Sequence, residues 1–346
     1  MKLKQVALRS LLFFALMITL LVIWQWPLVN YGLMQLRGQL EVVQRAMPLE
    51  EFLSLETTSP KQKEKIKIIK EARDFAFDRL GILPSENYTT IFDQKGQPSM
   101  YVVTACAPYA FKPRMWHFPV IGSFPYKGYF NKEKALAEAR KIKEEEALEV
   151  SVRTAGGWST LGWFKDPVLS NMLNRSEGDL ANLIIHELTH GTLFVKDSVT
   201  FNENLASFIG DKGALLFLEE KYGAEASEVI AYRNKLDDEE IFKSFMLTAA
   251  QSLDSLYSSF TSEADTLKAQ KKQQKIAEIK TAFDTLAFQS TVYKGYFDDF
   301  TPNNTYFMSM LRYNSQKQQL EEEWKTEYQG DLAAFLADLK MKYPSL

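Results

Sequence analysis

The chain has 346 residues, a formal net charge of −3 and a single Cys. A charge so close to neutral gives no sign of a nucleic-acid partner, and one Cys cannot form a disulfide within the chain. The length is enough for one large domain, or two closely packed lobes, after an amino-terminal segment.

The amino-terminal segment has a basic start and then an apolar run from Leu11 to Leu28. A helix of about 18 residues is roughly 27 Å long, which spans a membrane's hydrocarbon core. No small-residue cleavage site follows Trp24-Gln25-Trp26. We therefore predict a single-pass signal anchor in the inner (cytoplasmic) membrane, with the rest of the chain facing the periplasm or another extracytoplasmic space. A cleaved signal peptide is the alternative.

The next part of the chain mixes helical and strand patterns. Apolar residues at helical spacing predict helices, and β-branched or aromatic runs predict strands of a small sheet. Asn131 is expected to cap the second helix. The expected helices are 61–80 and 132–147, and the expected strands are 101–105, 116–121 and 148–153. Residues 152–160 are either an edge strand that pairs with an extended substrate or an ordinary hairpin turn.

A helical pattern then carries the sequence His186-Glu187-Leu188-Thr189-His190. The spacing of i and i+4 places both imidazoles on one helix face, where they can bind one Zn²⁺, and Glu187 can take a proton from a metal-bound water. This is the H-E-x-x-H motif of zincins. The surrounding residues are mostly apolar, so the helix is expected to be buried, and a metal would satisfy its polar groups.

Glu203 is the candidate for the third zinc ligand. Twelve residues separate it from His190, enough for a helix end, a short loop and a second helix that returns beside the first. The alternative is an acidic residue that simply favours the start of its helix. His117, the only other His, lies in an aromatic, turn-rich segment and is expected to pack at a rim.

The chain beyond Tyr222 is helical and charged, with a solvated run at 270–280. A peptidase benefits from a second electrophile that stabilises the oxyanion, commonly Tyr, His or Arg. Tyr306, Arg312 and Tyr313 are the candidates in this part, although each has the alternative of a packing or surface role.

Two resemblances extend these inferences. Asn202-Glu203-x-Leu205-Ala206 resembles the N-E-x-Φ-A signature of gluzincin aminopeptidases, in which that Glu is the third zinc ligand. The chain also resembles the bacterial putative aminopeptidase family of the zincin superfamily, which implies zinc-dependent aminopeptidase activity. The matching blocks are 31–40, 73–81, 116–130, 159–173, 186–190 and 201–208.

The sequence thus predicts an α+β, zincin-like metallopeptidase with a small mixed or antiparallel sheet, an active-site helix and a mostly helical carboxyl-terminal part. The expected parts are a signal anchor at 1–30, a catalytic region at 31–222 and a helical subdomain at 223–346. The partners are a peptide or protein substrate and the membrane, and endopeptidase activity stays open. The alternative function is a catalytically silent, membrane-anchored zinc-binding scaffold. Glu187 favours chemistry, because a structural zinc does not need it.

Overall fold

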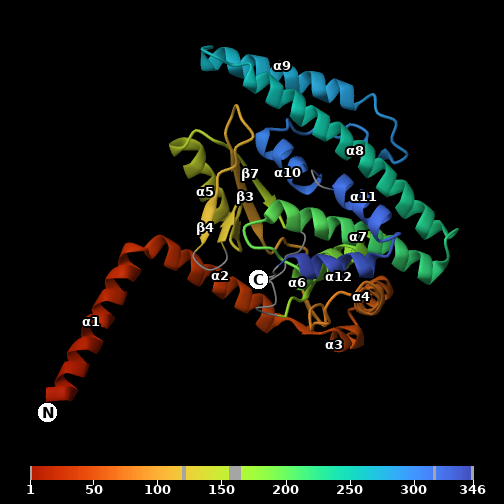
Figure 1. The fold of residues 1–346 in the computed structure, drawn as a ribbon. Helices are drawn as coiled ribbons and strands as arrows, with labels where there is room; N and C mark the ends of the chain where they lie inside the picture. Colours follow the sequence, from red (N-terminus) through yellow and green to blue (C-terminus); the bar gives the residue numbers. More distant parts are fainter. Residues whose placement is uncertain (1, 119–121, 156–164, 315–316, 344–346) are drawn as a thin grey trace. The chain divides into compact units, whose positions relative to one another are not determined.

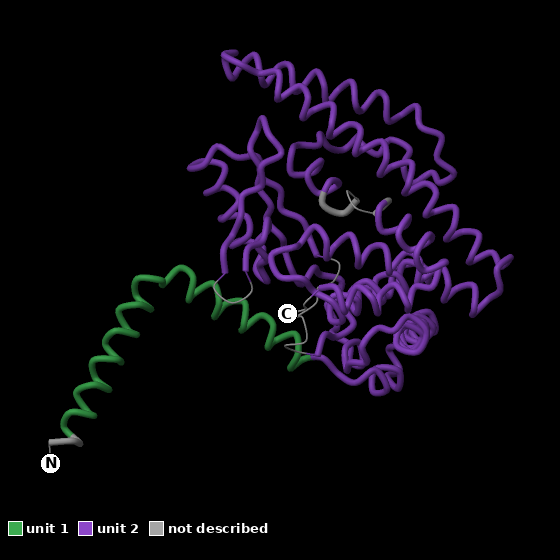
Figure 2. The backbone as a smooth tube through the Cα atoms, in the orientation of Figure 1, with its two compact units in different colours: residues 1–45 green, residues 46–346 purple. Residues whose placement is uncertain are grey.

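The computed structural model describes residues 2–118, 122–155, 165–314 and 317–343 (Figure 1). The chain forms two compact units, residues 1–45 and 46–346 (Figure 2). The expected division into 1–30, 31–222 and 223–346 stays a prediction. The helices that follow Tyr222 belong to the same unit as the residues before it.

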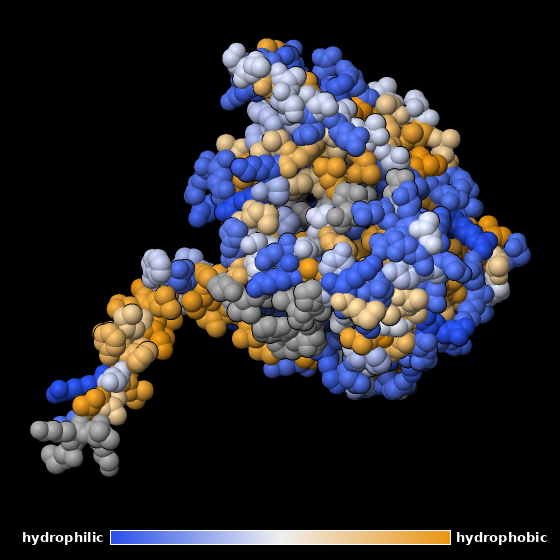
Figure 3. Space-filling model, in the orientation of Figure 1, coloured by the Kyte–Doolittle hydropathy of each residue, from blue (hydrophilic) through white to orange (hydrophobic). Residues whose placement is uncertain are grey.

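The first unit consists of α1 (Lys2–Trp24) and α2 (Trp26–Arg45). Residues Gln5–Trp24 of α1 have a mean hydropathy of 2.5, and none of this stretch is buried. Figure 3 shows mainly hydrophobic residues along this helix. Its length and composition allow it to cross a membrane, and a signal sequence would have the same properties. Pro27 lies in the first turn of α2, where its missing N–H leaves no helical bond unmade.

Within the described residues, the second unit contains the other α-helices and the strands. The helices are α3 (Leu49–Ser54), α4 (Pro60–Arg79), α5 (Lys132–Glu145), α6 (Glu177–Thr192), α7 (Val199–Tyr222), α8 (Ser227–Ser258), α9 (Asp265–Phe283), α10 (Asn304–Asn314), α11 (Lys317–Glu327) and α12 (Leu332–Lys342). The strands are β1 (Met47–Pro48), β2 (Thr90–Phe92), β3 (Tyr101–Cys106), β4 (Trp116–Phe118), β5 (Gly122–Phe124), β6 (Lys127–Tyr129), β7 (Glu149–Thr154) and β8 (Val168–Leu169).

The strands form three small sheets with the orders β1-β2-β8, β6-β3-β7 and β4-β5. Strands β2 and β8 are parallel and the other pairs are antiparallel, which confirms a mixed α+β fold. The longest pairing joins β3 to β7, from Tyr101 opposite Thr154 to Cys106 opposite Glu149. The expected strands at 101–105 and 148–153 and the helix at 132–147 are confirmed, and Asn131 caps α5 by accepting a bond from the Lys134 N–H at 2.8 Å.

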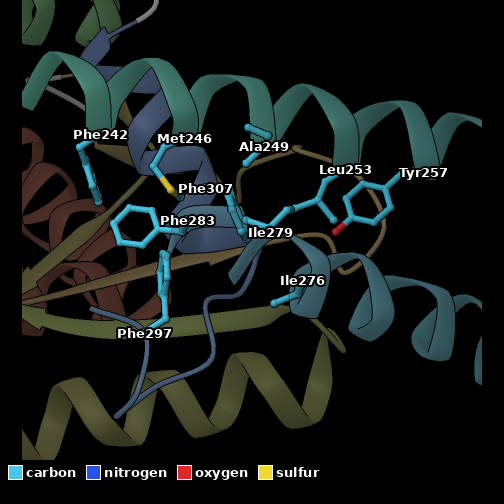
Figure 4. Packing of buried hydrophobic residues seen from close by; sticks show 11 residues of the cluster. Phe242, Met246, Ala249, Leu253, Tyr257, Ile276, Ile279, Phe283, Phe297 and Phe307 are labelled. Carbon is cyan, nitrogen blue, oxygen red and sulfur yellow. The ribbon is translucent and has the colours of Figure 1, made fainter. Parts of the chain in front are cut away.

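An aromatic cluster forms the core of the carboxyl-terminal part. Figure 4 shows side chains of α8, α9 and α10 pointing toward one another, with Phe283 and Phe307 among them. Both of these rings are at most 1% exposed. Burying a side chain of this size contributes about 1.5–3 kcal/mol, so the cluster gives these helices a substantial core of their own.

A buried polar network connects this helical part to the β6-β3-β7 sheet. The Lys272 ammonium of α9 donates to Glu149 Oε1 at 2.6 Å and to the Pro108 carbonyl at 2.7 Å. The Asn304 N–H at the start of α10 donates to Glu149 Oε2 at 2.7 Å. The Asn304 side chain is fully buried and accepts a bond from the Tyr257 hydroxyl. Burial of the ion pair is tolerated because the remaining polar atoms are also bonded.

Helix α6 approaches α8 closely at Gly178. A Cβ atom added at Gly178 would lie 2.3 Å from Cδ2 of Tyr232, whose ring is buried. Neither the ring nor the helix can move far in a packed interior. Glycine is therefore required at position 178 of α6, against which the Tyr232 ring of α8 packs.

We predict that Gly178→Ala lowers the free energy of unfolding by about 1–3 kcal/mol, because the added methyl group overpacks this contact. Gly191→Ala is the matched control on the same helix, since a Cβ there meets nothing within 4 Å. The control should be neutral or stabilise the helix by up to about 1 kcal/mol. Urea unfolding of the full chain measures both, and equal losses in the two variants would contradict the assigned contact.

Candidate metal centre

Helix α6 presents polar side chains in a buried setting. Ser176 caps its start, with Oγ accepting a bond from the Asp179 N–H at 3.1 Å. Its apolar residues Leu180, Ile184, Ile185 and Leu188 are at most 2% exposed. On the same helix Glu187 and His190 are only 8% and 7% exposed. Polar groups buried in this way need a partner that compensates for lost water.

The loop after α6 brings Glu203 of α7 back toward the two imidazoles. Asn202, which is 1% exposed, closes this loop with two bonds to Val195. Its Oδ1 accepts a bond from the Val195 N–H at 2.9 Å, and its Nδ2 donates to the Val195 carbonyl at 2.8 Å. This paired amide holds the first turn of α7, so the carboxylate of the next residue has a defined position. Sequence reasoning did not assign this role to Asn202.

A small residue lets α6 and α7 lie close together. A Cβ atom added at Gly210 would lie 3.1 Å from the Asn182 carbonyl oxygen and 3.3 Å from the His186 Cβ. These contacts are tighter than about nine in ten real Cβ contacts. Glycine at 210 therefore allows α7 to lie against the helix that carries both imidazoles.

The three candidate ligands converge as the sequence predicts. The Glu203 carboxylate oxygen Oε2 lies 3.6 Å from Nε2 of His186 and 3.8 Å from Nε2 of His190. The candidate ligand atoms of all three residues lie within 4.8 Å of one another. Ligand atoms at about 2.1 Å from a tetrahedral zinc would be roughly 3.4 Å apart. The two Glu203 distances are within about 0.4 Å of this value, and the three residues could hold one metal ion if the full group contracts.

The protonation preferences of the cluster also suit a cation. Burial lowers the pKa of His190 to about 4, so its imidazole is neutral near pH 7, as metal binding requires. Burial opposes the charged form of His186 as well, but the hydrogen bond with Glu203 and nearby carboxylates raise its pKa overall. Burial, and then the nearby Glu203 and Asp166 carboxylates, raise the pKa of Glu187 to about 7, although His186 opposes this. A cation bound among these groups would relieve the repulsion between carboxylates.

The second nitrogen of His190 is a feature of the same site. Nδ1 of His190 is buried and has no hydrogen-bond partner within the part of the chain that the structure describes. An unsatisfied buried polar atom costs about 1–3 kcal/mol. His190 therefore lacks the second hydrogen bond that usually orients a metal-binding imidazole.

The structure places the other predicted site residues elsewhere or leaves them undescribed. His117 lies exposed on β4, with Nδ1 2.7 Å from the Ser123 hydroxyl, as expected for a rim residue. The Tyr306 hydroxyl lies 3.0 Å from that of Tyr296 inside the aromatic cluster. No contact among the described residues joins Tyr306 to the metal cluster, so its catalytic role stays a prediction. The side chains of Arg312 and Tyr313, and residues 156–160 of the expected substrate strand, lie outside the described residues.

Comparison with known protein families found a match over most of the chain. A family model described as putative aminopeptidase covers residues 30–342. No curated protein and no solved structure matched the chain.

We predict that Glu203→Ala lowers zinc affinity by more than about 100-fold, because losing even an outer-shell partner of a ligand commonly costs about 10–100-fold. Inductively coupled plasma mass spectrometry of the full chain should find about one zinc per wild-type chain and much less in the variant.

Glu220→Ala is the matched control for this measurement. Glu220 lies on the same helix, but its side chain is 53% exposed and pairs with Arg79 at 2.8 Å. The control should keep its zinc. A wild-type chain that takes up no zinc when the metal is supplied would show that the cluster is not a zinc site.

Proposed function

The chain belongs to the putative aminopeptidase family, and we propose that it is a zinc-dependent aminopeptidase of the gluzincin type with a zincin-like catalytic fold. The observation that carries this proposal is the convergence of His186, His190 and Glu203 beside a fourth group, Glu187, which is not among the ligands. Two imidazoles and one carboxylate are the protein ligands of a common class of catalytic zinc site. That donor set leaves one position open for water or substrate.

Zinc in this position would supply a Lewis acid that polarises the scissile carbonyl and makes a water molecule more acidic. The protein's part is to hold three ligands in place and to keep a base beside them. Glu187 follows His186 directly on α6 and is 8% exposed, so bulk water does not compete strongly for its carboxylate.

Glu187 is the proposed general base and then the general acid. It accepts a proton from the attacking water while the water oxygen forms a bond to the carbonyl carbon. The carbon–nitrogen bond then breaks, and Glu187 delivers the proton to the leaving amine. One water is consumed for each peptide bond, and the products are a carboxylic acid and an amine.

We also propose that α1 anchors the protein in the cytoplasmic membrane and leaves the second unit on the extracytoplasmic side. The exposed apolar stretch Gln5–Trp24 supports the anchor, and the basic residues before it support the orientation. The substrate would then be a peptide or protein that reaches that compartment.

We predict that Glu187→Gln keeps zinc but lowers kcat/KM for peptide hydrolysis by about 100- to 10,000-fold, because general acid–base catalysis contributes about that much. The measurement is the release of new amino groups from a mixture of synthetic peptides, together with the zinc content of the same samples.

Glu177→Gln is the matched control, since this acid lies at the start of the same helix and pairs with the Tyr222 hydroxyl at 2.5 Å. It should retain full activity. Equal cleavage by the wild type and Glu187→Gln would refute the mechanism, and zinc binding without any cleavage would favour a silent scaffold. Peptides with acetylated amino termini should resist cleavage, and their hydrolysis would indicate an endopeptidase instead.

A further inference from the structure

A cavity of about 280 Å³ opens beside the metal cluster and extends along α6 toward its amino-terminal end. His186 and Glu187 line one end of it, and Asp179 and Arg175 line it near the start of the helix. The volume is close to the lower end of the roughly 300–1,000 Å³ usual for ligand pockets. A short segment of peptide therefore fits beside the proposed reaction centre.

The acidic side chains in the wall of this cavity already have partners. Lys235 of α8 pairs with Asp179 at 2.8 Å and also with Glu239. Lys243 pairs with Glu239 at 2.9 Å and lies 3.9 Å from Asp211.

Asp211 also accepts a bond from Asn182 Nδ2 at 2.7 Å. The network therefore holds two lysines against three carboxylates across α6, α7 and α8. It therefore keeps one net negative charge, although each of its carboxylates already lies within 4.0 Å of a lysine.

Arg175 differs from the other charged residues of this wall. Its side chain is exposed, and it makes no ion pair within 4.0 Å of an acidic group in the described part of the chain. A guanidinium presents a planar fork of donors that matches a carboxylate and can bind both of its oxygens. Arg175 also attracts the Asp179 and Glu187 carboxylates. Neither of them forms an ion pair with its guanidinium, whose donors can therefore bind the carboxylate of a ligand.

We propose that Arg175 selects peptides that carry a carboxylate on the carboxyl-terminal side of the cleaved bond, an inference that rests on the proposed aminopeptidase function for its orientation. Nine helical steps place the Glu177 backbone about 14 Å from that of His186, and Arg175 lies two extended residues before Glu177. The long arginine side chain covers part of that distance, and the remaining roughly 10 Å corresponds to about three residues of extended peptide. The carboxylate would then belong to the second or third residue after the cleaved bond, as an acidic side chain or as the peptide's own terminus.

The test measures binding without turnover, on the zinc-loaded full chain with Glu187→Gln. The probes are alanine pentapeptides with a free amino terminus and an amidated carboxyl terminus. Each peptide carries a single Glu or Gln, at one position from the second to the fifth. We expect the Glu peptide to bind about fivefold more tightly than its Gln partner at the third or fourth position, which is the scale of a partly exposed ion pair. Tri- and tetrapeptides with a free carboxyl terminus, compared with their amides, distinguish the terminal carboxylate from the side chain.

Adding Arg175→Gln should abolish this preference. Adding Arg140→Gln, an exposed arginine of α5 outside the cavity, should leave it unchanged. An unchanged ratio of Glu to Gln affinities after Arg175→Gln, or no preference in the parent, would overturn the inference.

Cleavage assays on the wild type separate this result from the proposed function. A carboxylate preference that depends on Arg175 supports the inference even if no peptide is cleaved, in which case only the peptidase proposal fails. Cleavage that shows no such preference leaves the peptidase proposal in place and refutes the role of Arg175.

Discussion

The contact between α6 and α7 is the constraint on which the candidate centre depends. Two candidate ligands come from one helix and the third from the next, so the distance between the helices sets the distance between the candidate ligands. Gly210 permits the close approach, and Asn202 determines how the chain turns between the helices. Movement of α7 away from α6 would carry the Glu203 carboxylate away from both imidazoles.

The same packing brings two carboxylates into repulsion. Glu187 and Glu203 are held near each other in a setting with little water, where like charges repel strongly. Folding of this region and cation binding are therefore expected to support each other, as in other proteins whose metal sites form only in the folded state. Burial keeps the His190 imidazole neutral, so it adds no positive charge that would repel a cation at this site.

The sequence predicted local features well and long-range features poorly. His186, Glu187 and His190 could be placed together because spacing along a helix decides which side chains share a face. Placing Glu203 beside them also required the resemblance to a known family, because the loop of residues 193–198 determines where the helix of Glu203 returns. The bonds of Asn202 go to backbone atoms of Val195, which no pattern of side chains reveals. The charged cavity wall was also missed, because Lys235 and Lys243 reach it from α8, far along the chain.

The network around Lys272 bears on how the protein is built as a whole. Glu149 lies on β7, whereas the groups that compensate it come from α9 and α10, more than a hundred residues later. A chain cut after Tyr222 would leave the Glu149 carboxylate without these donors and would expose the side of the sheet that α10 contacts. The helices after Tyr222 thus shield this side of the sheet from solvent. A fragment released at that point by proteolysis would be prone to aggregate, rather than persist as a smaller working form.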